Sequence, residues 1–176
     1  MSMEILHTAE FESPIGTLRI ASTQNGLAYI QLPHASGRGF MGWRRLHAPA
    51  SELVSDDRPN RHCITQILEF LEGERREFDL PLDLRGTPFQ LKVYDDVASI
   101  PYGASRSYGE VAKRVGSPGA ARAVGTANGA NPIPLVVPCH RVIGSDGQLH
   151  GYAGGLETKA RLLAMEQSAP VEGRLF

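Results

Sequence analysis

The sequence predicts an α/β protein in which a strand-rich first part is followed by a compact helical second half. Three observations support this prediction. Apolar and polar residues alternate in Thr17–Ile20 and Leu27–Leu32, as in strands with one buried face. Apolar residues recur at helical spacing after residue 60 and again after Pro88. A Gly-Thr-Pro sequence at residues 86–88 marks a boundary near the middle of the 176-residue chain.

Turn residues delimit the strands of the first third. The sequence S-P-I-G at residues 13–16 precedes the first alternating run, and Gln24-Asn25-Gly26 separates it from the second. We therefore expect an antiparallel meander. The next segment, His34–Asn60, is rich in Gly, Pro, Arg and Ser. It is expected to be an irregular connection with room for a short helix.

Two helices are expected around the boundary. The first has an apolar face and ends at Gly73, and Cys63 directly before this face is interpreted as a structural residue. Thr87 can cap the second helix and Pro88 can occupy its first turn, so this helix should begin there and end at Pro101-Tyr102-Gly103. The two apolar faces consist of Ile64, Ile67, Leu68 and Leu71, and of Phe89, Val93, Val97 and Ile100.

The second half contains the outline of a helix-turn-helix. Ser107 and Glu110 form a capping box for a helix that reaches Val115. A Gly-Ser-Pro-Gly turn at residues 116–119 leads into a second helix, Ala120–Asn128. Its side chains are nearly all small, and Arg122 is the one long side chain among them. Such a slim helix could insert one cation into a narrow groove. The alternative is a tightly packed helix with a solvated arginine.

Charge gives little information about partners. The net charge is −1. Residues 1–85 hold nine Lys/Arg and twelve Asp/Glu, a balance of −3, and residues 86–176 hold nine against seven, a balance of +2. The stretch Pro101–Asn128 has four basic residues against Glu110 alone. This is a weak basic patch, so composition alone does not establish nucleic-acid binding.

The cysteine count and the apolar runs point to a reducing compartment. Two cysteines do not make a disulfide framework, and no Cys/His cluster has the spacing of zinc ligands. No apolar run approaches the ~20 residues of a membrane helix, and the N-terminus lacks the features of a signal peptide. We expect a cytoplasmic protein without a membrane partner, in which a thiol stays free for chemistry.

Cys139 and His140 form the candidate chemical centre. The apolar run Leu135–Val137 ends at Pro138, which restricts the backbone that enters Cys139. A cysteine reacts as the thiolate, and an imidazole can remove its proton when a carboxylate orients the ring. Glu157 and Glu166 are both candidates for that carboxylate. The alternative is an inert core cysteine.

The sequence Pro138-Cys139-His140-Arg141-Val142, preceded by N-P-I-P at residues 131–134, resembles the active-site motif of the O6-methylguanine-DNA methyltransferases. The resemblance covers residues 100–166 in order and includes Ser107-Tyr108, A-A-R-A-V-G at 120–125 and G-Y-A-G-G-L at 151–156. Ser13–Leu32 also resembles the N-terminal domain of that family. The resemblance implies a ribonuclease-H-like α/β domain at residues 1–85 and a mainly helical, winged-helix-like domain with a helix-turn-helix at 86–176.

The same resemblance implies an activity, which is DNA repair by irreversible transfer of the alkyl group of O6-alkylguanine to Cys139, once per molecule. O4-alkylthymine is a further candidate substrate. His140 would be the base, acting through a water, and Glu166 would orient it. Asn131 would be the hinge of the active-site turn, and Tyr108 would donate to N3 of the leaving guanine. No cofactor and no metal are implied.

The implied partner is double-stranded DNA, approached from the minor groove by a monomer, with clustering of further copies on the same DNA as an extension. Arg122 would fill the gap left by the flipped-out nucleotide. The few basic residues predict modest affinity and moderate salt dependence. The remaining DNA-binding residues would be Ala120, Ala121, Tyr108, Ser117 and Ser145. The base pocket would comprise Val142, Tyr152 and Ala153, the last of which is Ser in many relatives.

Two rival functions compete with this activity. A damage-sensing module could flip bases without chemistry, but the related non-repairing group has Trp where this chain has Cys139. A cysteine hydrolase could use Cys139 and His140 with a carboxylate and would turn over. The helix-turn-helix and Arg122 would have no role in such a hydrolase.

Overall fold

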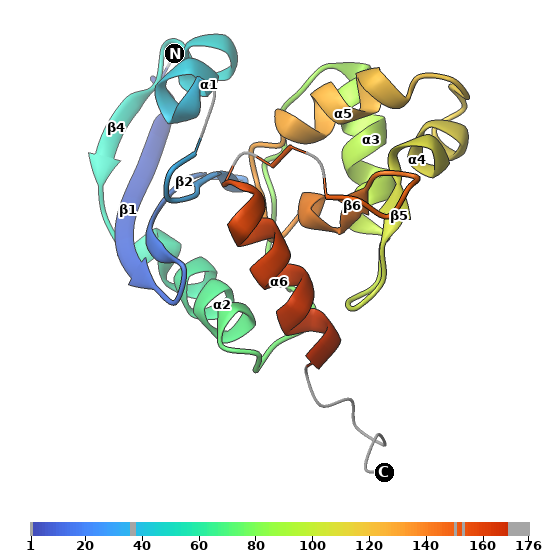
Figure 1. Ribbon diagram of the computed structural model, residues 1–176. Helices are drawn as coiled ribbons and strands as arrows, with labels where there is room; N and C mark the ends of the chain where they lie inside the picture. The colour runs from blue at the N-terminus through green and yellow to red at the C-terminus, as the bar shows by residue number, and fades with distance from the viewer. Residues whose placement is uncertain (1, 36–37, 150, 153, 169–176) are drawn as a thin grey trace.

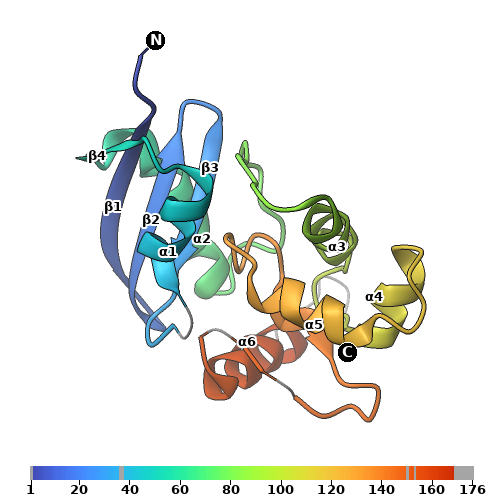
Figure 2. The same cartoon turned by 90° about the horizontal axis from the view of Figure 1, so that it is seen from above.

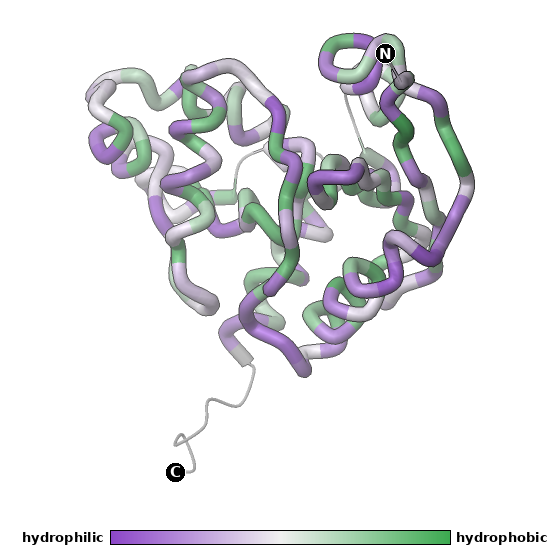
Figure 3. Tube along the Cα trace, turned by 180° about the vertical axis from the view of Figure 1, so that it is seen from behind, coloured by the Kyte–Doolittle hydropathy of each residue, from purple (hydrophilic) through white to green (hydrophobic). Residues whose placement is uncertain are grey.

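The computed structural model describes residues 2–35, 38–149, 151–152 and 154–168. A four-stranded sheet with its helices forms one side of the molecule, and three helices near the middle of the chain form the other, with the C-terminal helix between them (Figure 1). Hydrophilic and hydrophobic residues alternate along the trace of most elements (Figure 3). None of the helices among these residues is long and apolar enough to cross a membrane.

The expected meander is present. Strands β1 (Ile5–Ser13), β2 (Gly16–Thr23) and β3 (Gly26–Gln31) pair antiparallel in succession. Gly26 has a φ of +141°, and a Cβ atom there would lie 2.3 Å from the carbonyl oxygen of Pro81. Only glycine therefore allows the second turn to pack this closely on the connection from the first half to the second.

The expectation of an irregular connection over His34–Asn60 was wrong, although the short helix it allowed for is present. This segment contains the helix α1 (Gly39–His47), the strand β4 (Glu52–Ser55) and a 3-10 turn, η1 (Arg58–Asn60). Strand β4 pairs parallel with β1, which gives the sheet order β3-β2-β1-β4. Helix α1 lacks a side-chain cap, and β4 is a four-residue edge strand. Both depend on tertiary packing, so local sequence patterns did not reveal their limits.

Helices cover both faces of the sheet (Figure 2). Phe40 and Trp43 of α1 pack against Tyr29 on one face. Helix α2 (Arg61–Leu71) packs on the other face and ends before Gly73, as predicted. Its buried residues are Cys63, Ile67, Phe70 and Leu71, whereas Leu68 is only partly buried.

The second half is mainly helical, as expected. Helix α3 (Pro88–Ala98) begins with a capping box between Thr87 and Gln90, and α4 (Tyr108–Arg114) begins with the predicted box between Ser107 and Glu110. Helix α5 (Ala121–Gly129) starts one residue later than predicted, with Ala120 as an N-cap that has no capping side chain. The remaining elements are β5 (Arg106–Ser107), η2 (Cys139–Arg141), β6 (Val142–Ile143), which pairs parallel with β5, and α6 (Leu156–Ser168).

The two halves share one hydrophobic core. A single buried cluster includes Leu18 and Phe70 from the first half and Val97, Val124 and Cys139 from the second. The outer edge of β3 also forms a hydrogen bond to the second half of the chain, in which Ile30 N donates to Pro132 O at 2.8 Å. The sheet therefore supports the segment that leads into Cys139.

Candidate active site

Cys139 lies at the start of the turn η2 and its backbone is fully bonded. Its N–H donates to Val137 O at 2.7 Å. Its carbonyl oxygen accepts from the N–H of Val142 and, at 3.1 Å, from the side chain of Asn128. Because both peptide groups are tied, the direction of the side chain is set by the turn. Cys139 is 4% exposed.

The environment of Cys139 keeps its thiol protonated. Burial raises the pKa of the thiol. The Asn131 amide, the positive charge of Lys159 and the Tyr152 hydroxyl each lower it, but together they do not cancel the effect of burial. Among the described residues the Tyr152 hydroxyl has no hydrogen-bond partner of normal geometry, and of these three groups it lowers the pKa of the thiol least. A base is therefore needed to form the thiolate at neutral pH.

His140, the residue after Cys139, is the candidate for that base. Its ring is fully buried, and Nε2 lies 2.6 Å from Glu166 Oε2. Burial lowers the pKa of His140, so the imidazole is neutral, although the nearby Glu166 raises the pKa in part. An ionised carboxylate only accepts hydrogen bonds, so the proton is assigned to Nε2. Nδ1 then carries a free lone pair, and it has no partner among the described residues.

Glu166 is the centre of a buried network. Burial by itself would raise the pKa of Glu166, but hydrogen bonds from His140 and Arg141 lower it to about 2. Arg141 Nε donates to Oε1 at 2.8 Å and its Nη2 donates to Oε2 at 3.0 Å. The N–H of Gly103 adds a bond of 3.1 Å, and Arg141 Nη1 donates to Ile100 O at 2.8 Å. The carboxylate is therefore ionised and fixed.

The structure places Glu166, the residue that the resemblance implied, and not Glu157 against His140. Both lie on α6, nine residues apart. At ~100° per residue they point to opposite faces of the helix. Glu157 is exposed in the first turn, whereas Glu166 is 4% exposed and faces His140. Phe70 of α2 packs against the same histidine ring, with centroids 6.3 Å apart.

Three further residues of this site had no predicted role. Arg141 is part of the motif around Cys139, and it pairs with Glu166. Lys159 is fully buried, donates to Val142 O at 2.7 Å and lies 5.8 Å from the centroid of the Tyr108 ring. Asn128 donates to Cys139 O. A cation inside an apolar run, as at Arg141, is a sequence feature that predicts a buried counter-charge, whereas Asn128 and Lys159 have no comparable feature.

Asn131 is located where the resemblance implied. Its Nδ2 donates to Val137 O at 2.8 Å, and its Oδ1 accepts from the N–H of Ile133 at 3.0 Å. It follows α5 directly. The side chain therefore links the end of this helix to the turn before Cys139.

Most of the predicted DNA-binding residues gather at one hollow of about 650 Å³, whose lining includes Tyr108, Ala121, Arg122 and Ser145. Arg122 and Ser145 are exposed, and the ring of Tyr108 packs near Gly125. Ser117 lies away from this lining in the turn between α4 and α5, and its N–H donates to Ala112 O.

Two of the three predicted base-pocket residues are buried near Cys139: the N–H of Val142 donates to Cys139 O, and the Tyr152 hydroxyl lowers the pKa of the thiol. Val142 is fully buried, and its carbonyl oxygen accepts from Lys159. Tyr152 is 9% exposed, and its hydroxyl lowers the pKa of the Cys139 thiol. Ala153 lies outside the described residues. Among the residues that the structure describes, no group of three or more His, Cys, Asp or Glu side chains could hold a metal ion.

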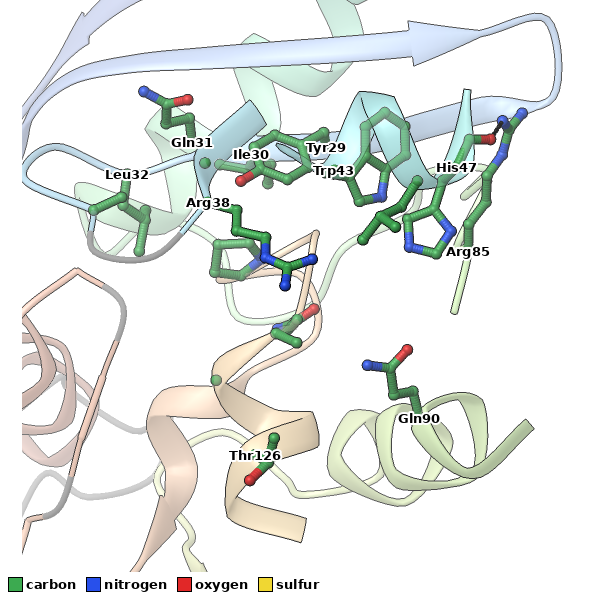
Figure 4. Close-up of a pocket in the computed structure, with 17 residues that line it drawn as sticks. Tyr29, Ile30, Gln31, Leu32, Arg38, Trp43, His47, Arg85, Gln90 and Thr126 are labelled. Atoms are coloured by element: carbon green, nitrogen blue, oxygen red, sulfur yellow. Dashed lines mark hydrogen bonds between the residues drawn. The ribbon is translucent and has the colours of Figure 1, made fainter. Parts of the chain in front are cut away.

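A second cavity, of about 540 Å³, lies between β3, α1 and the end of α5 (Figure 4). Arg38 points into it, and Asn131 is part of its wall. Neither Cys139 nor His140 lines it. This cavity is therefore separate from the turn that holds Cys139 and His140.

Comparison with known proteins covers both halves of the chain. Residues 6–84 match the family described as 6-O-methylguanine DNA methyltransferase, ribonuclease-like domain. Residues 88–168 match its DNA binding domain. A methylated-DNA–protein-cysteine methyltransferase of Mycobacterium tuberculosis is 42% identical over 98% of this chain and 99% of its own. An inducible one from Bacillus subtilis is 43% identical over 87% of this chain and 86% of its own.

Solved structures give the same result. The crystal structure of Mycobacterium tuberculosis OGT in complex with DNA has a TM-score of 0.81 at 43% identity and covers 93% of this chain and 94% of that one. An O6-methylguanine DNA methyltransferase of Methanococcus jannaschii has a TM-score of 0.65 at 26% identity over 96% of this chain and 98% of its own. The fold, the order of the motifs and these matches agree, and the chain belongs to the 6-O-methylguanine DNA methyltransferase family.

Proposed function

We propose that this protein is a methylated-DNA–protein-cysteine methyltransferase that moves the alkyl group from O6 of guanine in DNA to its own Cys139. The observation behind this proposal is a buried cysteine, Cys139, held in a tightly bonded turn and followed directly by His140, whose ring is oriented by Glu166. The names of the relatives at 42–43% identity support the same activity.

The first chemical step is removal of the thiol proton. The free Nδ1 of His140 takes it through a bridging water, and Glu166 stabilises the imidazolium that forms. The charge of Lys159 favours the resulting thiolate. Burial makes the negative charge of the Cys139 thiolate costly. The thiolate should therefore form only when the substrate is in place.

The second step is displacement at the alkyl carbon. The sulfur forms a bond to this carbon, the bond from carbon to O6 breaks, and the electron pair remains on guanine. The hydroxyl of Tyr108 stabilises this charge by donating to N3. Burial raises the pKa of Tyr108, which keeps its proton in place for that role. The product is a thioether, which offers water no carbonyl to attack, so each molecule acts once.

DNA would meet the face formed by α4, α5 and the loop that holds Ser145. A base cannot react inside the duplex, so the nucleotide is flipped out at a cost of a few kcal/mol. Arg122 projects from α5 with small neighbours and can fill the gap. Ala120, Ala121 and Ser117 permit close approach to the minor groove.

The remaining expectations belong to the same proposal. Residues 1–85 form the supporting domain and residues 86–176 the domain that binds DNA and accepts the alkyl group. The pocket for the flipped-out guanine base consists of Val142, Tyr152 and Ala153. The protein acts as a monomer in a reducing compartment such as the cytoplasm.

Mass spectrometry tests the proposal. The protein is mixed with an oligonucleotide that carries one O6-methylguanine, and intact protein and peptides are weighed. We expect one methyl group on the Cys139 peptide, no more than one per molecule, none in Cys139→Ser, and unchanged transfer in Cys63→Ser. DNA binding without transfer would contradict the proposal and support the damage-sensing module. Repeated turnover of an ester or amide without DNA would instead support a hydrolase.

A further inference from the structure

Two asparagines hold the peptide groups on either side of Pro138. Asn131 donates to Val137 O at 2.8 Å, and Asn128 donates to Cys139 O at 3.1 Å. The N–H of Asn131 also donates to the carbonyl oxygen of Asn128, at 3.2 Å. The resemblance to the family assigned a role to Asn131 and none to Asn128.

Stability does not account for an asparagine at position 128. The residue is 5% exposed. Its Oδ1 is buried and has no partner among the described residues. A buried amide with one unpaired atom costs free energy. Cys139 O already accepts from the N–H of Val142, so an apolar residue would leave no orphaned carbonyl at the turn.

The position of Asn128 connects the nucleophile to the DNA face. Asn128 and Arg122 are both on α5, six residues apart. This separation is about 9 Å along the helix axis. A helix is stiff over that distance, so any displacement of the Arg122 end would be carried to the carbonyl of Cys139.

We propose that Asn128 is a positioning residue that couples the DNA-recognition helix to Cys139 and sets the approach of its sulfur to the alkyl carbon. The inference rests on the proposed function, because it concerns the same sulfur. Asn128 touches the backbone of Cys139 and not the substrate. Its loss should therefore slow the transfer step and leave DNA affinity unchanged.

Asn128→Leu, which has a similar size, provides the test. Single-turnover transfer is measured at saturating DNA, and the Kd for the same DNA is measured with Cys139→Ser added to each variant. A 1 Å misplacement of reacting groups can cost ~100-fold. For one lost tether we expect transfer slower by on the order of ten-fold, with the Kd within about two-fold of that of the parent.

Asn60→Leu is the matched control. Asn60 is also fully buried, donates to two carbonyl oxygens and has an unpaired Oδ1, but it lies far along the chain in η1. The Asn60→Leu variant should have a lower urea midpoint than wild type and an unchanged transfer rate. If Asn128→Leu does not fold, Asn128→Ala, which favours the helix, is measured in its place.

Three results would overturn the proposal: a variant rate within two-fold of wild type, a slower rate matched by an equal loss of DNA affinity, or an equal slowing in Asn60→Leu. Failure of wild-type protein to transfer a methyl group would refute the proposed function instead. The two failures are therefore distinguishable.

Discussion

Replacing Glu166 by glutamine should destabilise the protein strongly at neutral pH and much less in acid. The side chain of Glu166 is 1% exposed and that of Arg141 is 7% exposed. Without the carboxylate, the guanidinium of Arg141 stays buried with no counter-charge. Removing one partner of a buried ion pair typically costs ~3–5 kcal/mol.

The pKa of Glu166 gives a second value for the same effect. It falls from 4.5 to about 2 on folding. This difference corresponds to ~3 kcal/mol. Because the pKa is lower in the folded state, the stabilisation is complete above about pH 5 and is lost as the pH falls toward 2. Roughly half of it should be gone near pH 3.5.

Urea unfolding followed by circular dichroism at pH 7, 5, 4 and 3.5 measures this effect. Circular dichroism is preferred because the single tryptophan, Trp43, reports on α1 in the sheet half. At each pH the free energy of unfolding of Glu166→Gln is subtracted from that of wild type. The contributions of the other acidic groups are the same in both proteins and cancel in this difference. Glu157→Gln, exposed in the first turn of the same helix, should lower the free energy of unfolding by no more than about 1 kcal/mol, the size of a helix-dipole interaction.

The reasoning would be refuted by a difference below about 1 kcal/mol at pH 7, far short of the cost expected for a broken buried pair. It would also be refuted by a difference that stays constant down to pH 3.5. In the first case the network would not stabilise the fold. In the second the carboxylate would not be the group that titrates.

Three other perturbations test separate parts of the site. Lys159→Met removes a charge that lowers the pKa of Cys139, so the midpoint of the pH dependence of its alkylation by iodoacetamide should shift to higher pH. An unchanged midpoint would contradict this electrostatic role. Tyr108→Phe should slow single-turnover transfer from methylated DNA while leaving the iodoacetamide rate intact; equal transfer rates would exclude the hydroxyl as a donor to guanine. Ser107→Ala removes the cap of α4 and should lower the free energy of unfolding by ~1 kcal/mol, seen as a lower urea midpoint; an unmoved midpoint would show that the box with Glu110 is dispensable.

Features that depend on neighbouring residues were predictable from the sequence. The capping boxes at Thr87 and Ser107 join residues three apart, and the turn at Gly26 separates strands that pair directly. The motif around Cys139 is continuous, so the sequence also shows the resemblance that makes Cys139 the candidate nucleophile and His140 the candidate base. Each of these features is formed by residues only a few positions apart, so the local sequence is enough to predict it.

Features that join distant parts of the chain depended on the tertiary structure. Strand β4 pairs with β1 across more than forty residues and has no pattern of its own. Helix periodicity separates the two glutamates, but only packing shows that Glu166 faces His140 and Arg141. The pKa values of these groups follow from burial, which a sequence does not specify. The sequence by itself determined most of the local elements and made Cys139 the candidate nucleophile. The tertiary structure decided which groups surround this cysteine and their protonation, because desolvation and long-range hydrogen bonds exist only once the chain has folded.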